Sequence, residues 1–381
     1  LALADTQALR SCEQIKSHHN QPKGLIMKKN LLATTALVAA GALVSTGAIA
    51  ESKKISLAVG GYMEQWVGFG SADHDTNGSV SDIDVHEDGE IHFKGSTTLD
   101  NGLTFGVNVQ LETQVQDDQI DESYIFVKGD FGEIVLGDEN GAAYVMHYGA
   151  STNGPGLNSG DHQAWIVGNS FELASTYNFA RRDNDSAKIR WMSPRFSGIQ
   201  LGASYAPEAT QDDDGFPTEA SNNGVNEEGV WTVAANYDNK FGGFRVRASA
   251  GYQGFGDSNT PGADNMWTAA VGLRLETGGF GLHVSGSRQN DRTATVETRD
   301  TIAGSVLYND GPMGISLGII YGKDSGETAT DDDRQVAVEL GGKYKLGPGV
   351  EAKGAIYYGD REDATVKNTG YAVVGGIKLS F

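Results

Sequence analysis

Apolar and polar residues alternate along most of this chain, from residue 54 to its end. In segments such as 103–111, 244–252, 267–275 and 313–319, every second residue is apolar or small. A period of two is that of a β-strand with one apolar and one polar face. The pattern predicts sixteen strands, near residues 54–68, 88–99, 103–114, 121–129, 132–138, 184–193, 198–206, 229–237, 243–254, 265–276, 279–289, 299–308, 312–322, 334–346, 349–359 and 369–381.

The connections between these strands alternate between short and long. The short ones are rich in Gly, Asp and Asn, which provide the positive φ angles of tight hairpins; examples are 100–102, 130–132, 239–242, 277–279, 309–311 and 347–349. The long ones are acidic: 70–88, 208–228, 256–264, 290–298, 323–333 and 360–368. An even number of strands with this alternation is typical of an antiparallel transmembrane β-barrel. The alternative is a soluble sandwich, which buries its apolar faces between two sheets and does not need strands of near-transmembrane length.

The amino-terminal region has the order of a secretory signal peptide. A basic start at Met27-Lys28-Lys29 precedes an apolar stretch over 31–44 and the small-residue site Ala48-Ile-Ala50. This order predicts cleavage between Ala50 and Glu51. The apolar stretch is shorter than the roughly 20 residues of a membrane-spanning helix. We therefore expect three parts: residues 1–26 as an over-extended gene start or, alternatively, a real extension, 27–50 as the signal peptide, and 51–381 as one barrel domain.

The composition of the expected mature chain excludes two classes of function. Residues 1–50 hold five of the 29 basic and two of the 50 acidic residues, so 51–381 carries a formal charge of −24. A net charge of this sign gives no electrostatic attraction to nucleic acid. The one cysteine of the chain, Cys12, lies upstream of Glu51, so we expect no disulfide or thiol chemistry. No apolar run after residue 51 reaches helical spanning length, so a membrane crossing requires strands in a closed barrel.

The end of the chain carries a further signal. Tyr371, Val373, Ile377, Leu379 and Phe381 share one face of the last predicted strand. A strand ending on an aromatic residue resembles the assembly signal of bacterial outer-membrane barrels. We expect Phe381 to serve assembly, because the final strand must pair with the first to remove the sheet edges.

One connection is longer and more apolar than the others. More than forty residues separate the strands near 132–138 and 184–193, and they include several aromatic residues and glycines. A long unstructured connection in a compact domain is usually functional. Together, the segments Gly132–Gly141 and Arg181–Gly198, with this stretch between them, resemble the Gram-negative general porins of the alphaproteobacterial type. The resemblance covers essentially all of 51–381.

That resemblance implies an all-β, 16-stranded antiparallel transmembrane barrel whose third external loop folds inward and narrows it. It also implies a homotrimer in the bacterial outer membrane that passes small hydrophilic solutes and ions passively. The expected partners are outer-membrane lipid and lipopolysaccharide. The alternatives are a solute-specific channel of the same fold or a plugged structural or anchor barrel.

The phase of the strands predicts which charged residues face the lumen, because a cation facing lipid near mid-membrane costs about 2–4 kcal/mol. The expected basic wall consists of Lys188, Arg190, Arg245, Arg247 and Arg274, with Arg181 and Arg182 at the mouth or constriction. We expect Asp138, Glu139 and Asp161 on the inserted loop to face this wall. The alternative is that these residues merely lie on the solvent-facing side of their strands.

Three further groups of residues contribute less to the functional interpretation. Aromatic residues near strand ends predict interface girdles: Tyr62, Trp66, Trp191, Tyr205, Trp231, Tyr237, Tyr252, Trp267, Tyr308, Tyr321, Tyr344 and Tyr371. Asp212–Asp214 and Asp331–Asp333 are solvated charge runs or, alternatively, Ca²⁺ sites. No cofactor or metal motif is present, and Gly314-Ile-Ser-Leu-Gly318 lies within an alternating strand rather than at the strand-to-helix turn of a hydrolase, so we expect no enzymatic activity.

Overall fold

The computed structural model describes residues 54–74, 78–113, 119–158, 165–166, 175–179, 185–208, 228–255, 266–290, 298–326, 333–363 and 367–381. The predicted leader, the cleavage site at Ala50 and Glu51, and the predicted pore residues Asp161, Arg181 and Arg182 lie outside these residues.

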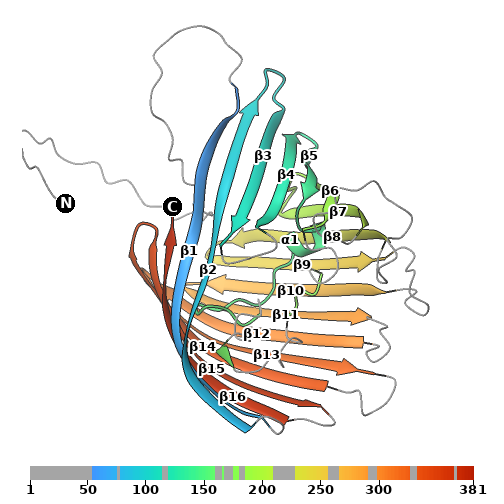
Figure 1. Cartoon of the computed structure of the whole chain (residues 1–381). Coiled ribbons are helices and arrows are strands. Elements are labelled where there is room, and N and C mark those ends of the chain that lie inside the picture. The colour runs from blue at the N-terminus through green and yellow to red at the C-terminus, as the bar shows by residue number, and fades with distance from the viewer. Residues whose placement is uncertain are drawn as a thin grey trace, which may run out of the picture. The chain divides into compact units, whose positions relative to one another are not determined.

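Sixteen strands and one short helix make up the described chain (Figure 1). The strands are β1 (Ser56–His74), β2 (Gly78–Thr98), β3 (Thr104–Glu112), β4 (Ile120–Gly129), β5 (Gly132–Asp138), β6 (Ala187–Met192), β7 (Ile199–Glu208), β8 (Glu228–Phe241), β9 (Phe244–Gly254), β10 (Trp267–Thr277), β11 (Phe280–Asn290), β12 (Thr298–Asp310), β13 (Met313–Ser325), β14 (Asp333–Gly347), β15 (Val350–Asp363) and β16 (Lys367–Ser380). The helix α1 covers Ala142–Val145. Among the described residues, no helix is long and apolar enough to span a membrane.

The strands form one closed barrel in which each strand pairs antiparallel with its neighbours in sequence. Closure occurs where β1 pairs with β16, with Tyr62 opposite Ser380. Phe381 extends this pairing: its N–H donates to the carbonyl oxygen of Gly61 at 3.1 Å, and its own carbonyl oxygen accepts from Gly61 N–H at 2.9 Å. The predicted sixteen-stranded antiparallel barrel is confirmed, and no sheet edge remains.

Burial alternates along the strands with the period that the sequence predicts. In β13, Ile315, Leu317 and Ile319 are about half exposed, whereas Ser316 is 3% exposed. The exposed residues of the other strands are also mostly apolar, and the buried ones are mostly small or polar. An outward apolar face and an inward polar face are the reverse of a soluble protein and suit a barrel in lipid.

The short turns lie where the sequence places them. Gly311, between β12 and β13, has φ 54°, and Gly349, between β14 and β15, has φ 69°. Residues with a Cβ rarely adopt these angles, so glycine allows the two-residue reversals.

The first predicted long loop is wrong in most of its length. Residues 70–88 are largely strand: β1 continues to His74 and β2 begins at Gly78, with paired residues throughout. The alternation of Asp82 and Asp84 with exposed Ile83 and Val85 carries the strand pattern through this acidic region. The prediction was wrong because a strand that lines a wet lumen can carry an acid at every second position, so a high density of acidic residues does not by itself indicate a loop.

The predicted aromatic girdles are correct only in part. On the outer face, the rings of Trp231, Tyr252 and Trp267 follow one another across three strands, with centroids 5.4 and 6.0 Å apart. Tyr62 and Trp66 instead belong to the inward set of β1: Tyr62 donates to Glu90 at 3.0 Å, and Trp66 is only 5% exposed. These two residues are therefore not part of a lipid interface.

Candidate functional site on the inner face of the barrel

The segment that follows β5 lies against the inner face of the wall. Its backbone N–H groups donate to hydroxyl groups on five strands of the wall: Ala142 to Ser204 of β7 (3.1 Å), Ala143 to Thr232 of β8 (3.3 Å), Tyr148 to Ser249 of β9 (2.8 Å), Ala150 to Ser285 of β11 (2.9 Å) and Asn153 to Ser316 of β13 (2.7 Å). We call these five side chains the hydroxyl track. Each belongs to the buried set of its strand.

Charged and phenolic side chains continue these contacts. Arg274 of β10 donates from Nε to the carbonyl oxygen of Gly149 at 2.8 Å. Glu339 of β14 accepts from Gly154 N–H at 3.2 Å, and the hydroxyl of Tyr357 of β15 lies 3.0 Å from the carbonyl oxygen of Gly156. Because many backbone groups of residues 142–156 have partners on the wall, this irregular segment keeps those hydrogen bonds without a sheet of its own.

A buried polar centre holds the returning part of the connection. Asn158 donates to Thr176 Oγ1 at 2.8 Å and accepts from Thr176 N–H at 2.8 Å. His147 Nε2 lies 3.1 Å from the same hydroxyl, and its ring meets the Tyr177 ring edge-on at 4.8 Å. Burial lowers the pKa of His147 to about 4, and the positive charge of Arg274 acts in the same direction. His147 is therefore neutral at pH 7.

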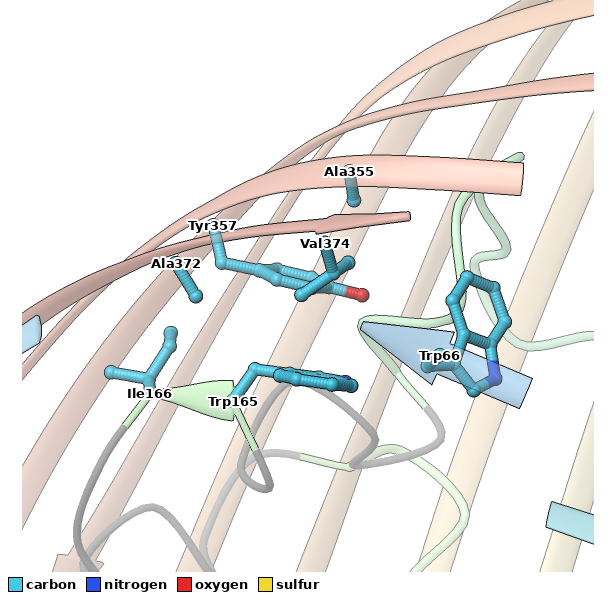
Figure 2. Packing of buried hydrophobic residues seen from close by; sticks show 7 residues of the cluster. All are labelled: Trp66, Trp165, Ile166, Ala355, Tyr357, Ala372 and Val374. Atoms are coloured by element: carbon cyan, nitrogen blue, oxygen red, sulfur yellow. The ribbon is translucent and has the colours of Figure 1, made fainter. Parts of the chain in front are cut away.

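An apolar cluster joins residues 165–166 of the connection to the strands at the barrel closure. Figure 2 shows Trp165 and Ile166 facing Tyr357, Ala372 and Val374, with Trp66 beside them. The Trp165 ring also lies 4.2 Å from that of His86 on β2. A Cβ at Gly68 of β1 would lie 2.4 Å from the Trp165 ring, so the glycine permits this close approach. The connection thus contacts the wall from β7 around to β2.

Comparison with known proteins places the chain in a family. A model of the Gram-negative porins matches residues 33–364. The chain belongs to this Gram-negative porin family.

Solved structures share the fold at low sequence identity. OmpT of Vibrio cholerae, expressed in the outer membrane, is 14% identical with a TM-score of 0.59 and covers 88% of this chain and 100% of its own. The in-vitro folded trimer form of the same protein has a TM-score of 0.55 at 14% identity, over 86% and 100% of the chains. A mutant of Rh. blastica porin gives 0.51 at 15% identity, over 86% and 100%. No curated protein matches. Its membership of the Gram-negative porin family makes this chain an outer-membrane protein that forms a diffusion channel.

The five predicted basic residues that the structure describes belong to the inward sets of their strands and have local partners: Lys188, Arg190, Arg245, Arg247 and Arg274. Arg245 forms a two-pronged ion pair with Asp238, with Nε 2.7 Å from the carboxylate, and Arg247 pairs with Glu276. Together with Arg274, whose guanidinium lies 5.9 Å from the Tyr148 ring, they form a cationic sector on β9 and β10. Lys188 is buried and donates to the carbonyl oxygens of Glu139 and Ser186.

Of the predicted constriction acids in the described part of the chain, Glu139 contacts the predicted basic wall directly, whereas Asp138 does not. Glu139 forms an ion pair with Arg190, and both side chains are less than 10% exposed. Asp138 is the last residue of β5, not part of the connection, and its register places it on the outward face with Leu136. It accepts from Ser123 Oγ at 3.1 Å. The two-residue period explains this, because Glu133, Val135 and Gly137 occupy the inward face.

The sequence analysis missed an acidic sector on β2 and β3. Asp82, Asp84, Asp88 and Glu112 belong to the inward set by register and are exposed. Two histidines interrupt them: His86 Nε2 lies 3.1 Å from Asp84, and His92 Nε2 lies 2.5 Å from Glu90. The alternation of these residues with Ile83, Val85 and Ile91 was the available signal.

No group of three or more His, Cys, Asp or Glu side chains in the described part of the chain could hold a metal ion. The acidic triplet 212–214 and the first two residues of the triplet 331–333 lie outside that part. Asp333 begins β14 and forms an ion pair with Arg361 of β15.

Proposed function

We propose that this porin is a general diffusion channel that the inserted connection narrows. The observation that carries the proposal is the hydroxyl track, which ties residues 142–153 to the inner side of the barrel. A segment occupying the inside of a sixteen-stranded barrel leaves less room for solute than the wall alone. We propose that this narrowing sets the size limit.

The charges of the two inner sectors support a transverse electric field. The acidic sector lies on β2 and β3 and the arginines on β9 and β10, on opposite sides of the strand order. Such a field orients dipolar solutes and disfavours apolar ones. Asp82, Asp84, Asp88 and Glu112 are exposed on the inward face, whereas the charges of Arg245 and Arg247 are each compensated by a carboxylate. We propose a modest preference for cations.

We also propose that the porin is a homotrimer in contact with lipid and lipopolysaccharide. Support comes from its family and from the trimer form of V. cholerae OmpT, whose fold it shares. The mass of the detergent-solubilised protein, measured by light scattering with the detergent subtracted, is expected to be three times that of the chain. A monomeric mass with full channel activity would contradict this assembly.

Shortening the connection tests the channel proposal. Replacing 142–172 by a short Gly-Ser linker is expected to raise single-channel conductance and to admit larger sugars in liposome swelling. The matched control shortens another long connection, 212–224, and is expected to leave both unchanged. Equal conductance of the two variants would show that the connection after β5 does not limit the pore. Saturation of transport by one solute would instead indicate a solute-specific channel.

A further inference from the structure

Three lysines lie side by side on the inner face of the neighbouring strands β14 and β15. Lys343, Lys345 and Lys353 share the phase of the buried residues Gln335 and Tyr357 on these strands, so all three belong to the inward set. Lys343 is directly opposite Lys353 in the register. Two like charges directly opposite each other across a strand pair destabilise a sheet. A negatively charged group bound between these two lysines would therefore relieve a repulsion within the wall.

The carboxylates around these lysines do not neutralise them. The inward charged residues at this end of β14–β16 and β1 are four lysines and two glutamates: Lys343, Lys345, Lys353, Lys378, Glu351 and Glu64. Glu64 forms an ion pair with Lys378 and lies 3.9 Å from Lys353 Nζ. The charge of Glu351 attracts Lys343 without an ion pair, whereas Lys345 and Lys353 repel it. Among the described residues, neither Lys343 nor Lys345 has an ion-pair partner.

The lysines lie just beyond the point where the inserted connection crosses β14. Glu339 accepts from Gly154 N–H at 3.2 Å, and a Cβ on Gly341 would lie 2.5 Å from the same nitrogen. Lys343 is the next inward residue of β14 toward the short turn that joins it to β15. In outer-membrane barrels the short turns face the periplasm. A solute that moves inward past the connection therefore meets these lysines next.

We propose that Lys343, Lys345 and Lys353 form a binding site for phosphate-bearing anions on the periplasmic side of the connection. A lysine ammonium binds phosphate as a compact point charge. A phosphate group carries up to two negative charges and several acceptor oxygens, so it can bridge opposed ammonium groups, whereas a carboxylate carries one charge.

This inference rests on the proposed channel, which would deliver the solute, and it adds a class of solute to it. It is compatible with a modest preference for cations, because screening limits the field of the lysines to about 8 Å at physiological salt. The site therefore acts on anions that already are beside it, whereas the exposed acids of β2 and β3 act on ions elsewhere along the lumen.

Calorimetric titration of the folded, detergent-solubilised protein tests the site. The probes are inorganic phosphate and acetate, each at the same ionic strength in chloride buffer. Lys343→Gln is expected to weaken phosphate binding about tenfold, as the loss of one charge-assisted hydrogen bond does. The double variant Lys343→Gln with Lys353→Gln is expected to weaken it about a hundredfold. Acetate is expected to bind the parent at least about tenfold more weakly than phosphate.

The matched control is Lys240→Gln, which removes an exposed inward lysine of β8 at the same end of the barrel. It is expected to bind phosphate as the parent does, and heat-modifiable migration on gels verifies that each variant is folded. Equal phosphate binding by Lys343→Gln and Lys240→Gln would overturn the proposal. Equal affinity of the parent for acetate and phosphate would overturn it too, since the lysines would then only attract anions without selecting them.

The midpoint of urea unfolding provides a second measurement of the same site. A ligand that binds only the folded protein stabilises it, so phosphate is expected to raise the midpoint of the parent and of Lys240→Gln but not that of the double variant. An equal rise in the double variant would contradict the site. Neither measurement requires conduction, so their failure, with conductance still raised by shortening the connection, would reject this site and leave the channel proposal intact.

Discussion

His147 shows how one residue inside the barrel can make the inserted connection sensitive to pH. Its buried ring has a pKa of about 4, against 6.5 for a free histidine. Since the packed form binds the proton more weakly, packing is at full strength above pH 6.5 and weakens as the pH falls toward 4, by roughly 3 kcal/mol in all. Single-channel noise is expected to rise over this range. Gln does not titrate in this range, so the variant His147→Gln is expected to lack the pH-dependent rise in noise. If the variant keeps the same pH profile, the rise comes from another group.

Leu317 tests the outward face at a single position. Its side chain is about half exposed on β13, and Leu317→Arg is expected to cost about 2–4 kcal/mol near mid-membrane. The control Leu317→Met keeps the residue apolar and is expected to be close to neutral. Urea titration of the folded fraction in lipid vesicles measures both. Ser316 is not a neutral control on the other face, because its hydroxyl accepts from Asn153 N–H. Equal stability of the two Leu317 variants would place this residue away from lipid.

At the scale of elements, the hydroxyl track holds the connection by individually modest bonds. Each neutral hydrogen bond contributes about 1 kcal/mol, and an N–H left unpaired in a buried place costs more. The triple variant Ser204→Ala, Ser249→Ala and Ser285→Ala is expected to leave the barrel folded but to increase proteolysis within 141–158. Ser305→Ala, which removes one bond to the carbonyl oxygen of Ser151, is the single-bond control. Identical proteolysis rates for triple and single variants would contradict the role of the track.

Most strands were predictable because each carries its own two-residue period, with glycines such as Gly311 at the reversals; the continuation of β1 and β2 through 70–88 was not. The path of the connection was not predictable, because an inward serine such as Ser249 can equally well face water or accept a hydrogen bond from the connection. The inward face of bases such as Arg245 and Arg247 follows from the phase of their strand alone. Their partners Asp238 and Glu276 were not, because pairing depends on register between strands. Asp138 was predicted on the connection but is the last residue of β5, and at a strand end a difference of one residue reverses the face of a side chain.

At the scale of the whole molecule, closure depends on the last residue. Phe381 exchanges two backbone hydrogen bonds with Gly61 of β1, so its deletion removes the final rung of the closing pair. Deletion is expected to lower the amount of folded, heat-modifiable protein in the outer membrane, whereas Phe381→Tyr, which keeps both backbone bonds and an aromatic ring, is expected to assemble normally. The measurement is the folded fraction in isolated outer membranes. Parental levels of the deletion variant would show that closure does not require this residue.

Ion selectivity is the whole-molecule property to which the acidic and the cationic inner sectors contribute in opposite directions. At physiological salt the Debye length is about 8 Å, so charges along the lumen act on passing ions more than charges at the external mouth. The triple variant Asp84→Asn, Asp88→Asn and Glu112→Gln removes exposed acids of the inward face. It is expected to shift the zero-current potential in a salt gradient toward anions.

Asp138→Asn is the matched control for this shift, because Asp138 belongs to the outward face, and it is expected to leave the potential unchanged. Glu139→Gln is expected to act in the same direction as the triple variant, since it removes the nearer of the two carboxylates that pair with the buried Arg190. Neutralising the distal acids Asp331 and Asp332 is expected to have little effect at high salt, because screening confines their field to the mouth. If those distal acids dominated the potential, the selectivity of the channel would arise at its entrance rather than along its inner wall.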